Sequence, residues 1–138
     1  MRPSEAIVLC NALLFDKGEE TFNTLDLLEY DVFNNELFLY KNGSGATYLK
    51  RENEVEKISS ENLPLGIVEK INVEKIKLNI DSKYIVLTSD GIKSDLTEVI
   101  KNSKGKSSKT LAQEILSYEG DKVDDDQTIV VINVIKNS

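Results

Sequence analysis

Two stretches decide the fold: Tyr84-Ile85-Val86-Leu87-Thr88-Ser89-Asp90-Gly91 and Asp124-Asp125-Asp126-Gln127-Thr128-Ile129-Val130-Val131-Ile132. In the first stretch an apolar strand runs into Asp90, and in the second a run of aspartates leads into an apolar strand. If the two strands are antiparallel neighbours, the end of one lies beside the start of the other. We therefore expect Asp90 and Asp125 to lie close enough to share one cation.

The composition restricts the chemistry to oxygen ligands. The chain has no histidine and a single cysteine, Cys10. These absences exclude a Ser-His-Asp triad, a disulfide and the usual zinc sites. Cys10 follows the apolar run Ala6-Ile7-Val8-Leu9, so we expect a buried structural thiol and not a nucleophile. The remaining carboxylates suit Mg²⁺ or Mn²⁺.

Length and charge bound the class of protein. A chain of 138 residues with 40% hydrophobic content is sized for one domain with its own core. It has no apolar run of about 18 residues and no basic N-terminal region before an apolar stretch, so we expect a cytoplasmic chain without membrane contact. A formal charge of −7 argues against nucleic acid as a partner, and an anionic phosphate substrate would need a metal to receive it.

The hydrophobic periodicity predicts an α+β chain. A helix is expected to begin near Ser4, as its N-cap, and to stop before Asp16. Strands are expected at 21–30, 36–41, 46–50, 55–58, 73–80, 84–88 and 129–135, with a hairpin turn at 33–36. Helical periods around 96–100 and 111–116 fall between the two acidic motifs. Two helices between neighbouring strands predict a sheet with helices on one face.

Both acidic motifs have plainer interpretations. Ser89-Asp90-Gly91 is also a common turn sequence. The run Asp124–Asp126 could be a solvated loop, although three adjacent carboxylates repel one another unless a cation neutralises them. An EF-hand does not explain the run, because the required glycine and glutamate are absent.

Two glycine-containing loops carry no chemistry in this interpretation. Asn42-Gly43-Ser44-Gly45 lacks the lysine and the following helix of a phosphate loop, so a hairpin turn is expected there. Leu63-Pro64-Leu65-Gly66-Ile67 is expected to be a rigid packing loop and not a ligand contact.

Taken together, the motifs resemble the metal-dependent protein phosphatase family (PPM, or type 2C, serine/threonine phosphatases), and within it the catalytic domain of bacterial stage II sporulation protein E. Six blocks in sequence order carry the resemblance: Asn11–Leu14, Thr24–Leu27, Lys41–Gly43 with Tyr48–Arg51, Leu63–Ile67, Thr88–Gly91 and Asp125–Thr128. Gln127 departs from it, because that branch usually carries methionine there.

The resemblance implies a sandwich of two antiparallel β-sheets flanked by helices, with two Mn²⁺ or Mg²⁺ ions at one end. It implies that Asp90 and Asp125 are metal ligands and that Gly91 and Asp126 support them. A water held by the metals would attack a phosphoserine or phosphothreonine of a protein substrate. In the sporulation branch that substrate is an anti-anti-sigma factor, which implies a role in sporulation or stress sigma-factor control.

The family also places a metal-bridging aspartate in an upstream Asp-Gly-Met-Gly-like motif, which this chain does not contain. We therefore expect residues 1–138 to be one N-terminally truncated domain that lacks the N-terminal strands and is weakly active or inactive alone. A homodimer that covers the helix around Ile7–Leu14 or an exposed edge strand is expected as well. The parent protein would be membrane-anchored with the phosphatase domain facing the cytoplasm. The alternative is a non-catalytic PPM-like module for protein binding or dimerisation.

Overall fold

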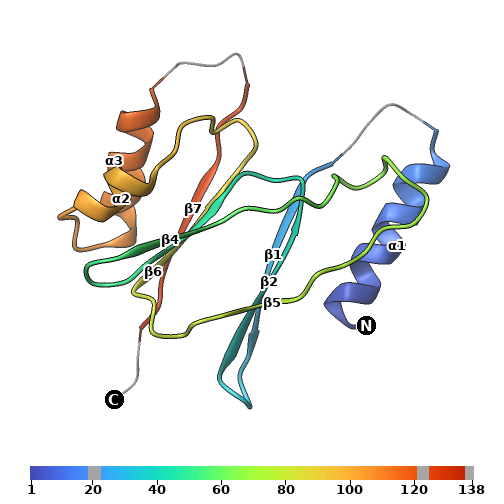
Figure 1. Ribbon diagram of the computed structural model, residues 1–138, viewed down its shortest axis with the longest axis horizontal. Helices are drawn as coiled ribbons and strands as arrows, with labels where there is room; N and C mark the ends of the chain where they lie inside the picture. Colours follow the sequence, from blue (N-terminus) through green and yellow to red (C-terminus); the bar gives the residue numbers. More distant parts are fainter. Residues whose placement is uncertain (19–22, 121–124, 136–138) are drawn as a thin grey trace. The chain divides into compact units, whose positions relative to one another are not determined.

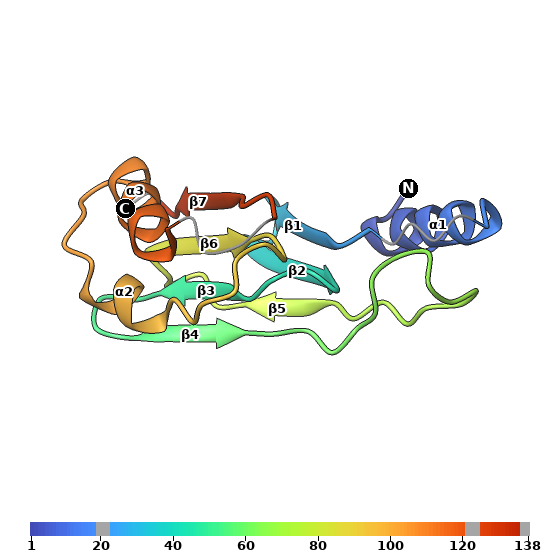
Figure 2. The same cartoon turned by 90° about the horizontal axis from the view of Figure 1, so that it is seen from above.

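The computed structural model describes residues 1–18, 23–120 and 125–135. Within these ranges the chain forms three helices and two antiparallel sheets (Figures 1 and 2), which confirms the predicted α+β class. In chain order the elements are α1 (Pro3–Asp16), β1 (Leu25–Asp31), β2 (Glu36–Asn42), β3 (Thr47–Lys50), β4 (Val55–Ile58), β5 (Ile76–Leu78), β6 (Tyr84–Thr88), α2 (Thr97–Asn102), α3 (Ser108–Glu119) and β7 (Ile129–Asn133).

The chain divides into two compact units, and each sheet belongs to one of them. Unit 1 comprises Met1–Ser44 and Ser60–Ile80 and holds the sheet β1-β2-β5. Unit 2 comprises Gly45–Ser59 and Asp81–Ser138 and holds the sheet β4-β3-β6-β7. Because neither unit is continuous in sequence, a cut at a single peptide bond does not separate them. The expectation of one domain over residues 1–138 stays a prediction.

In unit 1 the predicted hairpin of β1 and β2 is confirmed. The strands pair antiparallel from Leu25 opposite Asn42 to Asp31 opposite Glu36. Asp31 Oδ1 accepts the backbone N–H groups of Phe33 and Asn34, at 3.0 and 3.1 Å, so the turn satisfies its own donors. The Asn34 side-chain amide also donates to Asp31 Oδ2, at 2.8 Å. Together with the backbone donors, it holds the pKa of Asp31 below its ordinary value.

The helix α1 differs from the prediction in two respects. It begins at Pro3, and Arg2 is the N-cap residue in place of Ser4, because the Glu5 carboxylate accepts the Arg2 backbone N–H at 3.1 Å. Cys10 is exposed, so the expectation of a buried thiol is wrong. The buried stripe of the helix is narrow: Ile7 and Asn11 occupy it, and Cys10 falls outside.

Asn11 fixes the loop that follows Leu63. Its Nδ2 donates to the carbonyls of Val68 and Glu69, at 3.0 and 3.2 Å, and its Oδ1 accepts the Gly66 N–H at 2.9 Å. Leu65, 4% exposed, packs with Ile7 and Tyr40. The predicted packing role of this loop is therefore confirmed.

The segment Asn42–Gly45 is not a hairpin turn. The strand before it, β2, and the strand after it, β3, belong to different sheets, so the segment is a connection between sheets. Gly43 has a φ of 73°, and a Cβ there would lie 2.4 Å from Pro64 Cγ. The glycines correctly indicated an unusual backbone conformation, but they do not determine which strands pair.

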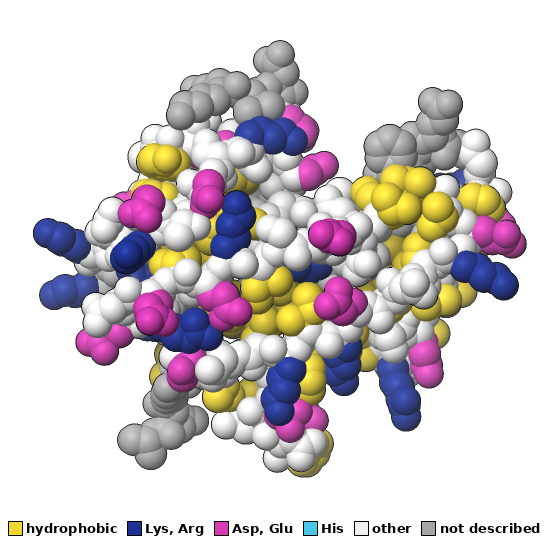
Figure 3. Space-filling model, viewed as in Figure 1, with side chains coloured by type: hydrophobic (Ala, Val, Ile, Leu, Met, Phe, Trp, Pro, Cys, Tyr) yellow, Lys and Arg dark blue, Asp and Glu magenta, His cyan; other side chains and the backbone are white. Residues whose placement is uncertain are grey.

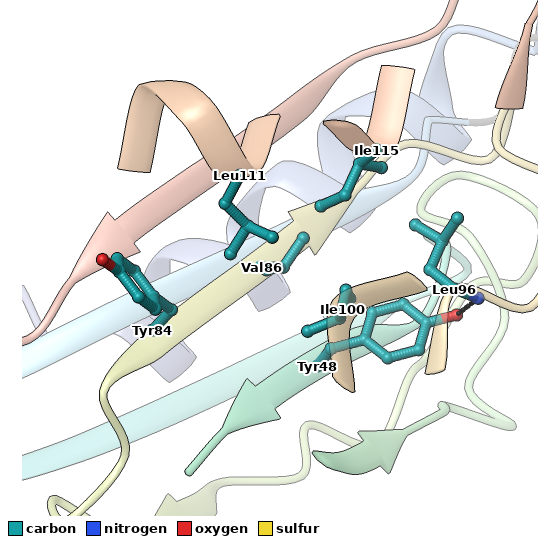
Figure 4. Packing of buried hydrophobic residues seen from close by; sticks show 7 residues of the cluster. All are labelled: Tyr48, Tyr84, Val86, Leu96, Ile100, Leu111 and Ile115. Atoms are coloured by element: carbon teal, nitrogen blue, oxygen red, sulfur yellow. Dashed lines mark hydrogen bonds between the residues drawn. The ribbon is translucent and has the colours of Figure 1, made fainter. Parts of the chain in front are cut away.

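In unit 2 the helices α2 and α3 cover one face of the four-stranded sheet, as predicted (Figure 4). The buried cluster takes side chains from β3, β6, α2 and α3: Tyr48, Tyr84, Val86, Leu96, Ile100, Leu111 and Ile115. Two polar contacts fix α2 in place. The Tyr48 hydroxyl accepts the Leu96 N–H at 3.0 Å, and Lys50 Nζ donates to the carbonyls of Ile100 and Ser103, both at 2.9 Å.

The surface of the described residues mixes both signs of charge. On the face drawn in Figure 3, acidic and basic side chains are interspersed with apolar ones. On this face the charges therefore form no extended area of one sign. None of the described helices has the length and apolar character needed to cross a membrane.

A buried ion pair lies on the β1–β2 hairpin. Lys41 Nζ, with a side chain 0% exposed, donates to the two Asp26 carboxylate oxygens at 2.8 and 3.0 Å, and the Ser44 hydroxyl donates to Asp26 Oδ1. Burial lowers the pKa of Lys41, while the bonds to Asp26 oppose that shift. Such a pair adds little net stability, but losing one partner leaves a buried charge uncompensated.

We predict that Lys41→Met destabilises the chain by about 3 to 5 kcal/mol, because Asp26 stays behind as an unpaired carboxylate. The double variant Lys41→Met/Asp26→Asn should recover most of that loss, since the introduced amide carries no charge and its oxygen can still accept from Ser44. Urea unfolding followed by circular dichroism measures both. A double variant no more stable than the single one would contradict the electrostatic explanation.

Candidate metal site at the ends of β6 and β7

The site is built on the pairing of β6 with β7. The two strands are antiparallel, with Tyr84 opposite Asn133 at one end and Thr88 opposite Ile129 at the other. The segment that leaves β6 at Thr88 therefore lies beside the segment that enters β7 at Ile129. This arrangement confirms the predicted strand adjacency.

Ser89 joins the two segments. Its backbone N–H donates to the Thr128 carbonyl at 2.9 Å, and its hydroxyl accepts the Thr128 N–H at 2.9 Å. The same hydroxyl lies 3.5 Å from the Asp126 carbonyl oxygen. No local pattern in the sequence predicts this role of Ser89, because its partners lie more than 30 residues further along the chain.

Two glycines allow the backbone to approach this closely. A Cβ on the buried Gly91 would lie 2.0 Å from the Asp126 carbonyl oxygen. A Cβ on Gly45 would lie 2.4 Å from Thr88 Oγ1 and 2.6 Å from the Ser89 carbonyl oxygen. Any side chain at either position would push these backbones apart. Gly91 was expected to support the site, whereas Gly45 was not singled out.

The candidate ligands are at the surface of this junction. Asp90, Asp125 and Asp126 are all exposed. Asp125 Oδ1 accepts the Asp126 N–H at 2.8 Å, and the Asp90 backbone carbonyl accepts from Lys93 Nζ. Asp124, the first residue of the acidic run, lies outside the described residues.

The donors fit a hard divalent cation in kind but not in number. Carboxylate oxygens on Asp90 and Asp125 are ligands that Mg²⁺ and Mn²⁺ prefer. Over residues 1–18, 23–120 and 125–135, however, no group of three or more acidic, histidine or cysteine side chains is arranged to hold a metal. The described residues of the junction therefore offer too few such donors for a complete coordination sphere.

A buried glutamate outside the motifs fixes the loop after Asp90. Glu119, 0% exposed, stands at the end of α3, and its Oε1 accepts the backbone N–H groups of Lys93 and Ser94 at 2.9 and 3.4 Å. Glu119 is not among the residues predicted from the sequence. A signal was present, since Glu119 follows Leu111 and Ile115 at spacings of four and so belongs to the buried stripe of the helix.

Gln127 turns part of its side chain inward. Its Nε2 is buried, and no acceptor among the described residues lies within hydrogen-bond distance. A buried amide donor without an acceptor costs stability. Among the described residues this donor is therefore unsatisfied, at the position where the resemblance leads one to expect methionine.

Comparison with known proteins gives a consistent result. The model of the family "Stage II sporulation protein E (SpoIIE)" matches residues 1–135. Stage II sporulation protein E of Priestia megaterium is 26% identical over 96% of this chain, which corresponds to 26% of that protein. The protein of the same name from Bacillus subtilis (strain 168) is also 26% identical, and there the match covers 18% of its length. The chain therefore spans about a quarter or less of these curated relatives.

Solved structures agree in fold. The phosphatase domain of the cell fate determinant SpoIIE from Bacillus subtilis, presoaked with Mn, aligns with a TM-score of 0.66 at 25% identity, over 100% of this chain and 68% of that one. A structure of the PP2C phosphatase domain with a fragment of the regulatory domain, from the same protein, aligns with a TM-score of 0.81 at 24% identity, over 100% and 46%.

We predict that Gln127→Met stabilises the chain by about 1 kcal/mol, because methionine fills a similar volume and removes the buried donor. The matched control is Gln113→Met on the exposed face of α3, which should change stability by less than about 0.5 kcal/mol. Urea midpoints measure both variants. A destabilised Gln127→Met would mean that the amide has an acceptor in solution.

Proposed function

The chain belongs to the stage II sporulation protein E family, and from this premise we propose that it forms part of a metal-dependent serine/threonine phosphoprotein phosphatase. The observation that carries the proposal is the junction of β6 and β7, where Ser89 and Gly91 hold Asp90 against the segment of Asp125 and Asp126. Relatives of the family include a phosphatase domain studied after presoaking with Mn.

Each residue of the junction has a separate task in this proposal. Asp90 and Asp125 hold Mn²⁺ or Mg²⁺, which when bound would act as a Lewis acid on the phosphoryl group and activate water. Ser89 keeps the two loops together, and Gly91 admits the Asp126 backbone. The hydrogen bond from the Asp126 N–H orients the Asp125 carboxylate, which would hold the cation. Glu119 and Lys93 fix the loop in which Asp90 stands.

The substrate and the cellular setting are also part of the proposal. The family name places relatives in sporulation, so we propose a phosphoserine or phosphothreonine of an anti-anti-sigma-type regulatory protein as the substrate, in sporulation or stress sigma-factor control. In this setting the chain acts in the cytoplasm, and its parent protein is anchored in the membrane.

A second function, as a protein-binding or dimerisation module, is favoured by α1. Four large apolar side chains of this helix are exposed, between 38% and 61%: Val8, Leu9, Leu13 and Phe15. An exposed apolar helix face is typical of an interaction surface. A second copy of the chain is the proposed partner.

We predict that the 138-residue chain binds Mn²⁺ weakly and hydrolyses phosphoserine peptides slowly or not at all, because two aspartates give only part of a coordination sphere. A longer chain that supplies the expected upstream aspartate should be active. In that longer chain Asp90→Asn and Asp125→Asn should each lower Mn²⁺ affinity and kcat, whereas Glu52→Gln, an exposed acid away from the junction, should change neither. Mn²⁺ titration by electron paramagnetic resonance and phosphate release measure these effects.

Robust turnover by the 138-residue chain, lost in Asp90→Ala, would contradict the incomplete site. Turnover unaffected by either aspartate would contradict the metal-ligand assignment itself.

We predict that the chain self-associates at high concentration through α1. Leu9→Lys/Leu13→Lys should shift the population toward monomer, because two charges would be buried in the contact. The control Lys77→Glu, an exposed position on β5 of the same unit, should leave the association unchanged. Light scattering after size exclusion measures the mass. A wild-type chain that stays monomeric at high concentration would refute the dimer.

A further inference from the structure

A polar pocket opens beside the Asp90 loop within unit 2. Its volume is about 300 Å³, near the lower end of the range for ligand pockets, so it suits a side chain better than a cofactor. Its wall takes residues from β3, from β4 and the segment after it, and from the segment around Asp90. Its polar side chains outside β3 are those of Lys57, Ser59, Thr88, Lys93, Ser94 and Asp95.

The pocket is close to the candidate ligands. Thr88 and Ile92 line it, and they stand two residues before and two residues after Asp90. Successive Cα atoms are about 3.8 Å apart, so the wall comes within about 7 Å of the Asp90 backbone. A substrate that presents its phosphate to Asp90 and Asp125 would bring neighbouring side chains to this pocket.

The pocket is cationic in an acidic chain. Lys57 and Lys93 contribute two ammonium groups against one carboxylate, that of Asp95, and Ser59 and Ser94 add two hydroxyls. The chain as a whole carries a formal charge of −7. The two ammonium groups therefore offer partners to an anionic side chain, while the Glu119 carboxylate behind the loop is bonded to the Lys93 and Ser94 N–H groups.

Both lysines can donate hydrogen bonds to an anionic ligand. Lys57 Nζ lies 3.3 Å from Asp95 Oδ2, but their side chains are 39% and 61% exposed, so the pair is weak and a ligand carboxylate can share the ammonium. Asp95 is held in place by the N–H and the hydroxyl of Thr97, at 2.9 and 2.6 Å. Lys93 has three donors, one of which goes to the Asp90 carbonyl.

We infer that this pocket is a substrate subsite for an acidic side chain placed two positions from the phosphorylated serine or threonine. On an extended peptide, side chains two residues apart point the same way and are separated by about 7 Å. A peptide whose phosphate lies at Asp90 can therefore bring a side chain to the pocket wall, which is formed in part by residues two positions from Asp90. The inference rests on the proposed phosphatase function, because the phosphate must sit at the junction for the spacing to apply.

Peptide binding to the 138-residue chain tests the subsite without turnover. Fluorescence anisotropy at millimolar Mn²⁺, so that a cation can receive the phosphate, compares labelled peptides with serine or phosphoserine that carry Glu or Gln two positions before or after that residue. At least one Glu peptide should bind about fivefold more tightly than its Gln partner. Lys57→Gln should remove that preference, whereas Lys77→Gln, an exposed lysine paired with Glu36 at 3.8 Å, should keep it. In NMR spectra, the backbone amide signals of Ser59 and Ser94 should shift when the Glu peptide is added.

The outcomes separate the subsite from the proposed function. Phosphate-dependent binding with no preference for Glu would overturn the subsite and leave the phosphatase proposal standing. A Glu preference that survives Lys57→Gln, or the absence of binding by every peptide, would also overturn it. A Lys57-dependent preference that is equal for phosphorylated and unphosphorylated peptides would support an acidic-peptide pocket and count against the phosphoserine at the junction.

Discussion

The antiparallel pairing of β6 with β7 is the constraint on which the candidate site depends. Once Thr88 stands opposite Ile129, the residues that follow one strand and precede the other must meet. Ser89 then satisfies the backbone groups of the opposite segment, and Gly91 leaves room for the Asp126 carbonyl. A shift of the register by one residue would turn every side chain of β7 to the other face and separate these partners.

The core that holds this pairing also holds the loop of the site. The helices α2 and α3 bury the face of β6 that carries Tyr84 and Val86. The last residue of α3, Glu119, accepts the N–H groups of the loop after Asp90, and Tyr48 of β3 accepts the first N–H of the α2 region. Packing and site geometry are therefore coupled, because the same elements provide both. Substitutions in α3 can disturb the Asp90 loop without touching an acidic motif.

Much of the local structure could be predicted from the sequence. The β1–β2 hairpin, the strands at the two acidic motifs and the helices between them follow from apolar periodicity and turn residues, which act over a few neighbours. The Asn42–Gly45 connection could not, because glycine reports an unusual backbone and not the partner of the next strand. Cys10 was misplaced for a related reason, since an apolar sequence does not say which face of a helix is covered.

By itself, then, the sequence determined the class of the fold, the order of its elements and the two acidic motifs, together with the family whose blocks it carries. The three-dimensional arrangement was needed to find the sheet to which each strand belongs, the close approach of Gly45 and Gly91 to distant backbone, the burial of Glu119 and Lys41, and the pocket of Lys57 beside Asp90. The difference lies in the distance along the chain over which each kind of signal acts. Propensity and periodicity are properties of neighbours along the chain, whereas burial and close contact join residues far apart in it.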